Sequence, residues 1–183
     1  SPRKNGNTLN LIKVVLKELE NEGIETEILE IGGKLIHGCT ACYKCKDNLN
    51  KRCAIDNDCI NTCIEKMIEA DGIILGSPTY FGNVTTEMKA LIDRAGIVAR
   101  ANNGLFKRKI GAPVVAVRRA GASFVIHAIT NLFFLTEMIV PGAIYWNLGQ
   151  GRGIGECAND EEGIQTMKNL GQNMAWLLKK TNQ

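Results

Sequence analysis

The stretch "DGIILGSPTYFGNVT", residues 71–85, combines an uninterrupted apolar run with a turn. A short apolar run that ends in Gly, Ser and Pro is typical of a buried parallel strand leaving its sheet. Pro78 stiffens the turn, Thr79 offers a hydroxyl, and Gly82 permits close approach of the backbone. Tyr80 and Phe81 offer flat surfaces. The segment therefore predicts a strand whose carboxyl end can receive a planar aromatic ligand.

Outward from this strand, helical and strand patterns alternate along the whole chain. Helices are predicted over 9–19, within 61–70, and over 84–101, 123–137 and 160–180. Strands are predicted over 24–31, 71–80, 112–118 and 143–147. This alternation predicts an α/β fold with a doubly wound parallel sheet, in one domain that spans residues 1–183.

The chain begins with a second turn, "SPRKNGNT", which leads directly into the first predicted helix. A Gly-rich turn at a helix N-terminus presents free N–H groups and the positive end of the helix dipole, so it can cradle a phosphate. An ordinary helix cap is the alternative. Because a phosphate cradle in such a sheet follows a strand, we expect a strand before Ser1 that the given sequence lacks.

A third turn, "VRRAGAS" at residues 117–123, follows the strand predicted over 112–118. Two adjacent arginines at that place favour negative charge nearby, although they can also be ordinary surface residues. All three turns would lie at the carboxyl edge of one sheet, where they supply phosphate contacts, a stacking surface and polar edge contacts. Flavin mononucleotide (FMN) needs this arrangement.

Four of the seven cysteines form a C-x2-C-x2-C-x7-C array in a loop over residues 38–57: Cys39, Cys42, Cys45 and Cys53. Close thiolate spacing of this kind can hold an iron–sulfur cluster or a metal ion. A [4Fe–4S] cluster, a zinc ion and free or redox-active thiols all stay open. An odd number of cysteines without a visible signal peptide favours reduced thiols over disulfides.

Composition excludes several classes of function. The formal net charge of +3 and the aromatic content of 5% argue against nucleic-acid binding. No apolar run reaches the roughly 18 residues that a membrane span requires. We therefore expect a cytoplasmic protein without membrane or nucleic-acid partners.

The chain resembles the flavodoxin-like NAD(P)H-dependent FMN reductase and iron–sulfur flavoprotein family. The resemblance rests on "SPRKNGNT", "GCTACYKC", "ADGIILGSPTYFGNVTTEMKALIDR", "RRAGA", "MIVPGAIYWN" and the last predicted helix. It implies strand order 2-1-3-4-5, with the first strand missing here, and association into a homodimer or homotetramer. It also implies FMN contacts from Ser1, Arg3, Asn7, Thr8, Pro78, Thr79, Tyr80, Phe81, Gly82, Arg119, Gly121 and Ala122.

The expected function is that of an FMN-dependent oxidoreductase, with a [4Fe–4S] cluster on the four cysteines and a ferredoxin-like electron donor. Without the cluster, the alternatives are an NAD(P)H-dependent FMN or quinone reductase and a non-enzymatic electron-transfer flavoprotein. No catalytic residue is expected, because flavin chemistry needs no dedicated protein base.

Overall fold

The sheet of the computed structural model, which describes residues 1–181, has three parallel strands in the order β1-β2-β3. They are β1 (Gly72–Pro78), β2 (Ile110–Val117) and β3 (Leu148–Gln150). Strand β2 is buried along its whole length, as the continuous apolar sequence "IGAPVVAV" requires of a central strand. The predicted α/β class with a parallel sheet is therefore confirmed.

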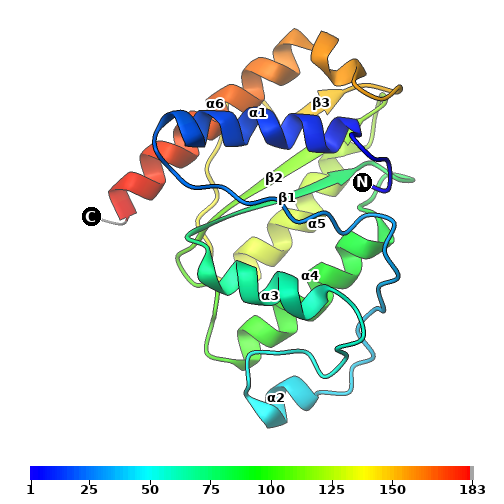
Figure 1. The fold of residues 1–183 in the computed structure, drawn as a ribbon, viewed down its shortest axis with the longest axis vertical. Coiled ribbons are helices and arrows are strands. Elements are labelled where there is room, and N and C mark those ends of the chain that lie inside the picture. Colours follow the sequence, from blue (N-terminus) through cyan, green and yellow to red (C-terminus); the bar gives the residue numbers. More distant parts are fainter. Residues whose placement is uncertain (182–183) are drawn as a thin grey trace.

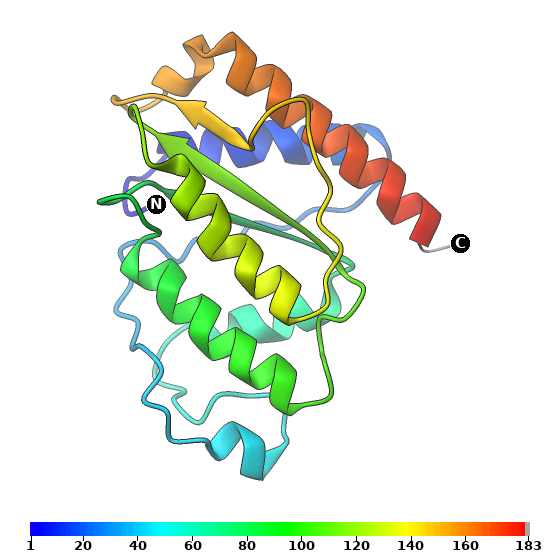
Figure 2. The same ribbon diagram turned by 180° about the vertical axis from the view of Figure 1, so that it is seen from behind.

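Helices cover both faces of this sheet (Figures 1 and 2). One side carries α1 (Asn7–Asn21) and α6 (Glu161–Thr181), which pack on one apolar core. The other side carries α3 (Ile60–Glu69), α4 (Thr86–Ala101) and α5 (Ala122–Leu135), which pack on a second core. All five helices agree with the sequence-based prediction.

The predicted strand over 24–31 is wrong, because these residues form neither strand nor helix. A strand is stabilised by pairing with a neighbour, and among residues 1–181 none pairs with this segment. Two adjoining cavities of about 520 Å³ and 190 Å³ lie between 27–29 and the free edge of β1. This groove lies where the predicted order would seat its first strand, and that part of the prediction stays open.

The predicted strand over 143–147 is also wrong, since pairing with β2 begins only at Asn147, whose carbonyl accepts from the Val115 amide at 3.0 Å. Ile144, Tyr145 and Trp146 are exposed, so they cannot anchor a strand on the core. Two short elements were not predicted: α2 (Lys44–Asn48), inside the cysteine-rich loop, and the 3-10 helix η1 (Glu156–Asn159). Within residues 1–181, no helix has the length and apolarity to cross a membrane.

Candidate functional site

The carboxyl edge of the sheet brings together the three turns singled out in the sequence. The Thr79 amide donates to the Ala116 carbonyl at 2.9 Å, which fixes the turn after β1 beside the end of β2. A Cβ atom placed on Gly76 of β1 would lie 3.1 Å from the Thr8 side chain, so the start of α1 packs directly against β1. The predicted common edge is therefore present (Figure 1).

The turns after β1 and β2 touch each other through two glycines. A Cβ atom on Gly121 would lie 3.2 Å from the Cα of Gly82 and 3.3 Å from the Thr79 side chain. Gly121 also has φ +90°, in the left-handed region that favours glycine. It is the N-cap of α5 and offers no side-chain cap, so the first amides of that helix are left for another acceptor.

Two side-chain hydroxyls at this edge are buried without a hydrogen-bond partner. They belong to Thr8, in the first turn of α1, and to Thr79, in the turn after β1. Within the described residues, no other buried side-chain nitrogen or oxygen lacks a partner. Because an unpaired buried hydroxyl destabilises a fold, two of them at one edge fit a polar ligand that completes their hydrogen bonds.

The start of α1 is open in the same sense. Its N-cap is Gly6, which supplies no side-chain hydrogen bond to the first turn of the helix. Ser1 Oγ accepts from the Arg3 amide at 3.2 Å, and Arg3 Nη1 donates to the Arg152 carbonyl at 2.8 Å. This turn is thus held in place while the helix amides stay available, as phosphate binding requires.

Asn7, which the resemblance places at the phosphate, uses its side-chain amide to join α1 to a loop over 151–157. Its Nδ2 donates to the Gly153 carbonyl at 2.8 Å, and its Oδ1 accepts from the Cys157 amide at 3.3 Å. The sequence reasoning did not include this loop in the site. Its signal is the glycine-rich sequence "GRGIG", residues 151–155, which follows β3 just as the other two turns follow β1 and β2.

The turn after β1 presents its aromatic side chains to solvent. Tyr80 and Asn83 exchange two backbone hydrogen bonds of 2.9 and 3.0 Å, which forces residues 81 and 82 into left-handed conformations. Phe81 is fully exposed and Tyr80 is 44% exposed. Arg119 lies on the neighbouring turn and is exposed as well. These side chains provide an apolar surface and positive charge beside the buried hydroxyls.

The four cysteines lie in the loop that passes around α2, and their exposure differs. Cys39 and Cys42 are exposed, Cys53 is half-buried and Cys45 is buried. Burial raises the pKa of the Cys45 thiol, and the thiols of Cys53, Cys42 and Cys39 raise it further, so each of these three lies within electrostatic reach of Cys45. Their soft donors suit an iron–sulfur cluster, but over residues 1–181 no three such side chains already form a metal site.

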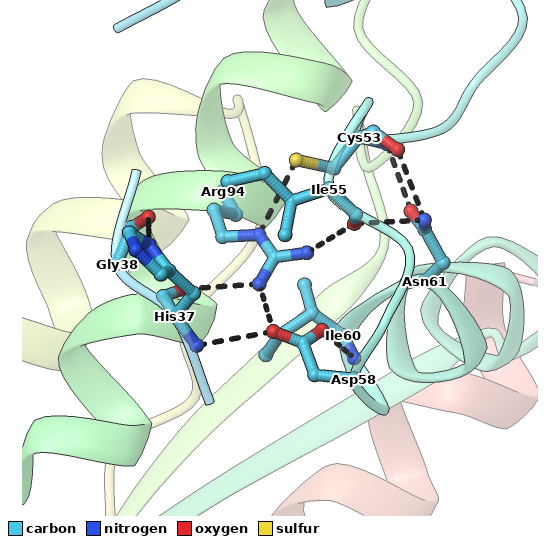
Figure 3. A network of polar contacts seen from close by, with 8 residues as sticks. All are labelled: His37, Gly38, Cys53, Ile55, Asp58, Ile60, Asn61 and Arg94. Carbon is cyan, nitrogen blue, oxygen red and sulfur yellow. Dashed lines mark hydrogen bonds and ion pairs between the residues drawn. The ribbon is translucent and has the colours of Figure 1, made fainter. Parts of the chain in front are cut away.

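A buried arginine of α4 fastens this loop to the fold (Figure 3). The Arg94 guanidinium pairs with Asp58 at 2.5 Å and donates to the carbonyls of His37 and Ile55 at 3.0 and 2.6 Å. Its Nε donates to Cys53 Sγ at 3.3 Å. Burial acts to raise the pKa of Asp58, but hydrogen bonds from Arg94 and from the Ile60 and His37 amides hold that pKa below its ordinary value.

Known proteins are similar to this chain over nearly its whole length. An iron–sulfur flavoprotein of Methanocaldococcus jannaschii is 38% identical over 98% of this chain and 94% of its own length. One of Methanosarcina thermophila is 33% identical over 97% of this chain and 91% of its own. Among solved structures, an archaeal flavodoxin superposes with a TM-score of 0.61 at 16% identity, covering 97% of this chain and 94% of its own.

The parallel sheet with helices on both faces, and with open turns at its carboxyl edge, defines a flavodoxin-like flavoprotein. Residues 1–153 match the NADPH-dependent FMN reductase family, and the chain belongs to that family. It is an FMN-dependent oxidoreductase.

Proposed function

We propose that FMN binds across the three turns, with its phosphate at the start of α1 and its ring system against the turn after β1. The unpaired hydroxyls of Thr8 and Thr79 are the observation that carries this proposal. Ser1, Arg3 and Thr8 take the phosphate, and Arg119, Gly121 and Ala122 line the pyrimidine edge of the ring. The ring rests on Pro78, Thr79, Tyr80, Phe81 and Gly82. When bound, FMN supplies hydride or single-electron transfer.

Asn7 takes an indirect part in this arrangement. Its side-chain amide is already engaged with the loop over 151–157. It therefore orients the first turn of α1 and brings Gly153 and its neighbours to the edge of the site. Direct contact with the phosphate is left to the backbone amides and to the residues named above.

We further propose that Cys39, Cys42, Cys45 and Cys53 bind a [4Fe–4S] cluster. The proposal is supported by the soft donor set and by the names of the two similar flavoproteins. In this form the protein accepts single electrons from a ferredoxin-like donor. The family description favours a second candidate, NADPH-dependent reduction of FMN or a quinone without a cluster.

An anaerobic absorption spectrum with iron and sulfide analysis tests both proposals. Flavin bands, a broad shoulder near 400 nm and about four irons per chain are expected for a cluster flavoprotein. Flavin bands without iron would contradict the cluster and leave the NADPH-dependent reductase. A colourless protein that does not take up added FMN would contradict the flavin site.

A homodimer or homotetramer is proposed from exposed apolar side chains at the end of α5 and in the strand-free segment after it. The exposed side chains are those of Phe134, Leu135, Ile144, Tyr145 and Trp146. Where large apolar side chains gather on a surface, they commonly mark a protein interface. Light scattering should give a mass of at least twice 20.0 kDa, and Trp146→Glu should lower that mass. A monomeric mass for the unaltered protein would contradict the proposal.

A further inference from the structure

Arg94 is fully buried, and the acceptors of its four hydrogen bonds all belong to residues 37–58 rather than to its own helix. Removing a guanidinium and a carboxylate from water costs about as much free energy as their attraction returns. An apolar side chain of similar volume would stabilise the core of α4 at least as well. The ion pair with Asp58 is therefore better explained by the geometry it imposes than by added stability.

The first geometric consequence concerns the two ends of the cysteine-rich loop. The His37 carbonyl precedes Cys39, whereas Asp58 and the Ile55 carbonyl follow Cys53, and one guanidinium holds all three. Asp58 Oδ2 also accepts from the His37 amide at 3.1 Å, so the two ends of the loop bind each other as well (Figure 3). The planar donor fork of Arg94 fixes both ends relative to α4.

The second consequence concerns Cys53, which is held at three points. Its amide donates to Asn61 Oδ1 at 2.8 Å, its carbonyl accepts from Asn61 Nδ2 at 3.0 Å, and its sulfur accepts from Arg94 Nε at 3.3 Å. Figure 3 shows Asn61 and Arg94 on opposite sides of this residue. The exposed Cys39 and Cys42 have no comparable anchors to α3 or α4.

We propose that Arg94 is a positioning residue for the cluster site: it closes the cysteine-rich loop and fixes Cys53 as its first ordered ligand, with a hydrogen bond to the ligating sulfur. The inference rests on the proposed cluster. Partners that orient a metal ligand contribute about 10- to 100-fold to metal affinity. Hydrogen bonds to cluster sulfurs also raise the reduction potential.

The variant Arg94→Lys tests this inference, because it keeps the positive charge and loses the donor fork. Arg100→Lys is the matched control, since Arg100 lies on the same helix and is exposed. We expect Arg94→Lys to retain at least tenfold less iron and sulfide during dialysis against a chelator, and its remaining clusters to have a lower midpoint potential. Asp58→Asn should loosen the loop while leaving the midpoint potential unchanged, because the bond from Nε to sulfur remains. FMN content verifies that each variant is folded.

Iron retention and midpoint potential equal to those of the unaltered protein would overturn the inference while the proposed cluster stands. If the unaltered protein binds FMN but no iron, the proposed cluster fails, and hydrogen exchange of the iron-free protein then decides about Arg94. Amides over 37–58 should exchange at least tenfold faster in Arg94→Lys than in the unaltered protein, and no faster in Arg100→Lys. If Arg94→Lys does not fold, Asp58→Asn replaces it in this comparison. Equal exchange in all of them would overturn the loop closure.

Discussion

At the scale of single residues, the proposed FMN site is marked by polar groups that the protein itself leaves without hydrogen-bond partners. The sequence pattern indicates the first-turn amides of α1 and the Thr79 hydroxyl, whereas the family resemblance implies Thr8. The sequence could not indicate that the Asn7 amide is engaged elsewhere, because its partners lie about 150 residues away, in the loop over 151–157.

The unpaired hydroxyl of Thr79 leads to the first prediction. Thr79→Val keeps the shape of the side chain and removes the buried hydroxyl, so the FMN-free protein should gain about 1 kcal/mol in unfolding free energy. FMN affinity should fall about tenfold, since one hydrogen bond to the ligand is lost. Denaturant unfolding and the quenching of flavin fluorescence measure the two effects.

Thr166→Val is the control for that experiment, because the buried Thr166 hydroxyl already donates to the Glu162 carbonyl at 2.8 Å. This variant should be no more stable than the unaltered protein and should bind FMN equally well. An FMN affinity of Thr79→Val equal to that of Thr166→Val would rule out contact between Thr79 and the flavin.

The thiols provide a second residue-scale prediction. Burial, assisted by the nearby Cys59, raises the pKa of Cys63 to about 11. Because only the thiolate attacks an alkylating reagent, about 1% of Cys63 is reactive at pH 9, compared with about three quarters of an unperturbed thiol. Cys42 is exposed, and its pKa is lowered by the Lys44 amide, so it should react first. Mass spectrometry after iodoacetamide treatment of the iron-free protein checks this order, and equal labelling would refute it.

At the scale of elements, sequence periodicity predicts the strands and helices whose own apolar residues pack against a core. The apolar run of β2 is buried on both faces, that of β1 alternates between buried and half-buried residues, and all five long helices present an apolar side to a core. The segment 24–31 has an equally good alternating pattern and is not a strand, because a pattern does not supply a neighbour to pair with. The unpredicted α2 is only five residues long and has a single buried side chain.

The contact between the turns after β1 and β2 leads to an element-scale prediction. Gly121→Ala introduces a left-handed alanine whose Cβ presses against Gly82, so we expect a loss of about 1–2 kcal/mol in unfolding free energy and weaker FMN binding. Gly23→Ala is the matched control, since Gly23 has φ +77° and open space around it. Both variants introduce backbone strain, which thermal unfolding measures. Only Gly121→Ala should also displace the turn after β1, which FMN titration measures. Unchanged FMN affinity in Gly121→Ala would contradict a site built on this contact.

At the scale of the whole molecule, the two apolar cores lie on opposite faces of a sheet in which β1 has one unpaired edge within residues 1–181. Strand β2 is paired on both sides, whereas β1 pairs with β2 and faces the groove along its other edge. An unpaired edge exposes backbone groups that a paired strand protects. No sequence pattern distinguishes the two strands, because both are apolar and of similar length.

Hydrogen exchange should reveal this asymmetry residue by residue. The Thr79 amide points toward β2, so by the two-residue period those of Leu75 and Ser77 do too, and those of Ile74 and Gly76 point into the groove. Ile74 and Gly76 should exchange at least tenfold faster than Leu75 and Ser77, with Val114 and Val115 of β2 as slow references. Uniformly slow exchange along β1 would mean that a further strand or another chain covers its edge.

The loop closure by Arg94 also has a consequence for the order of events during synthesis of the chain. A ribosome releases the four cysteines some forty residues before it releases Arg94, so the thiols emerge well before the helix that anchors them. During that interval the cysteine-rich segment is tethered at one end only, and its thiols are open to oxidation or to the wrong metal. Loading of the proposed cluster is therefore expected to be a late event in the life of the nascent chain, after α4 has docked.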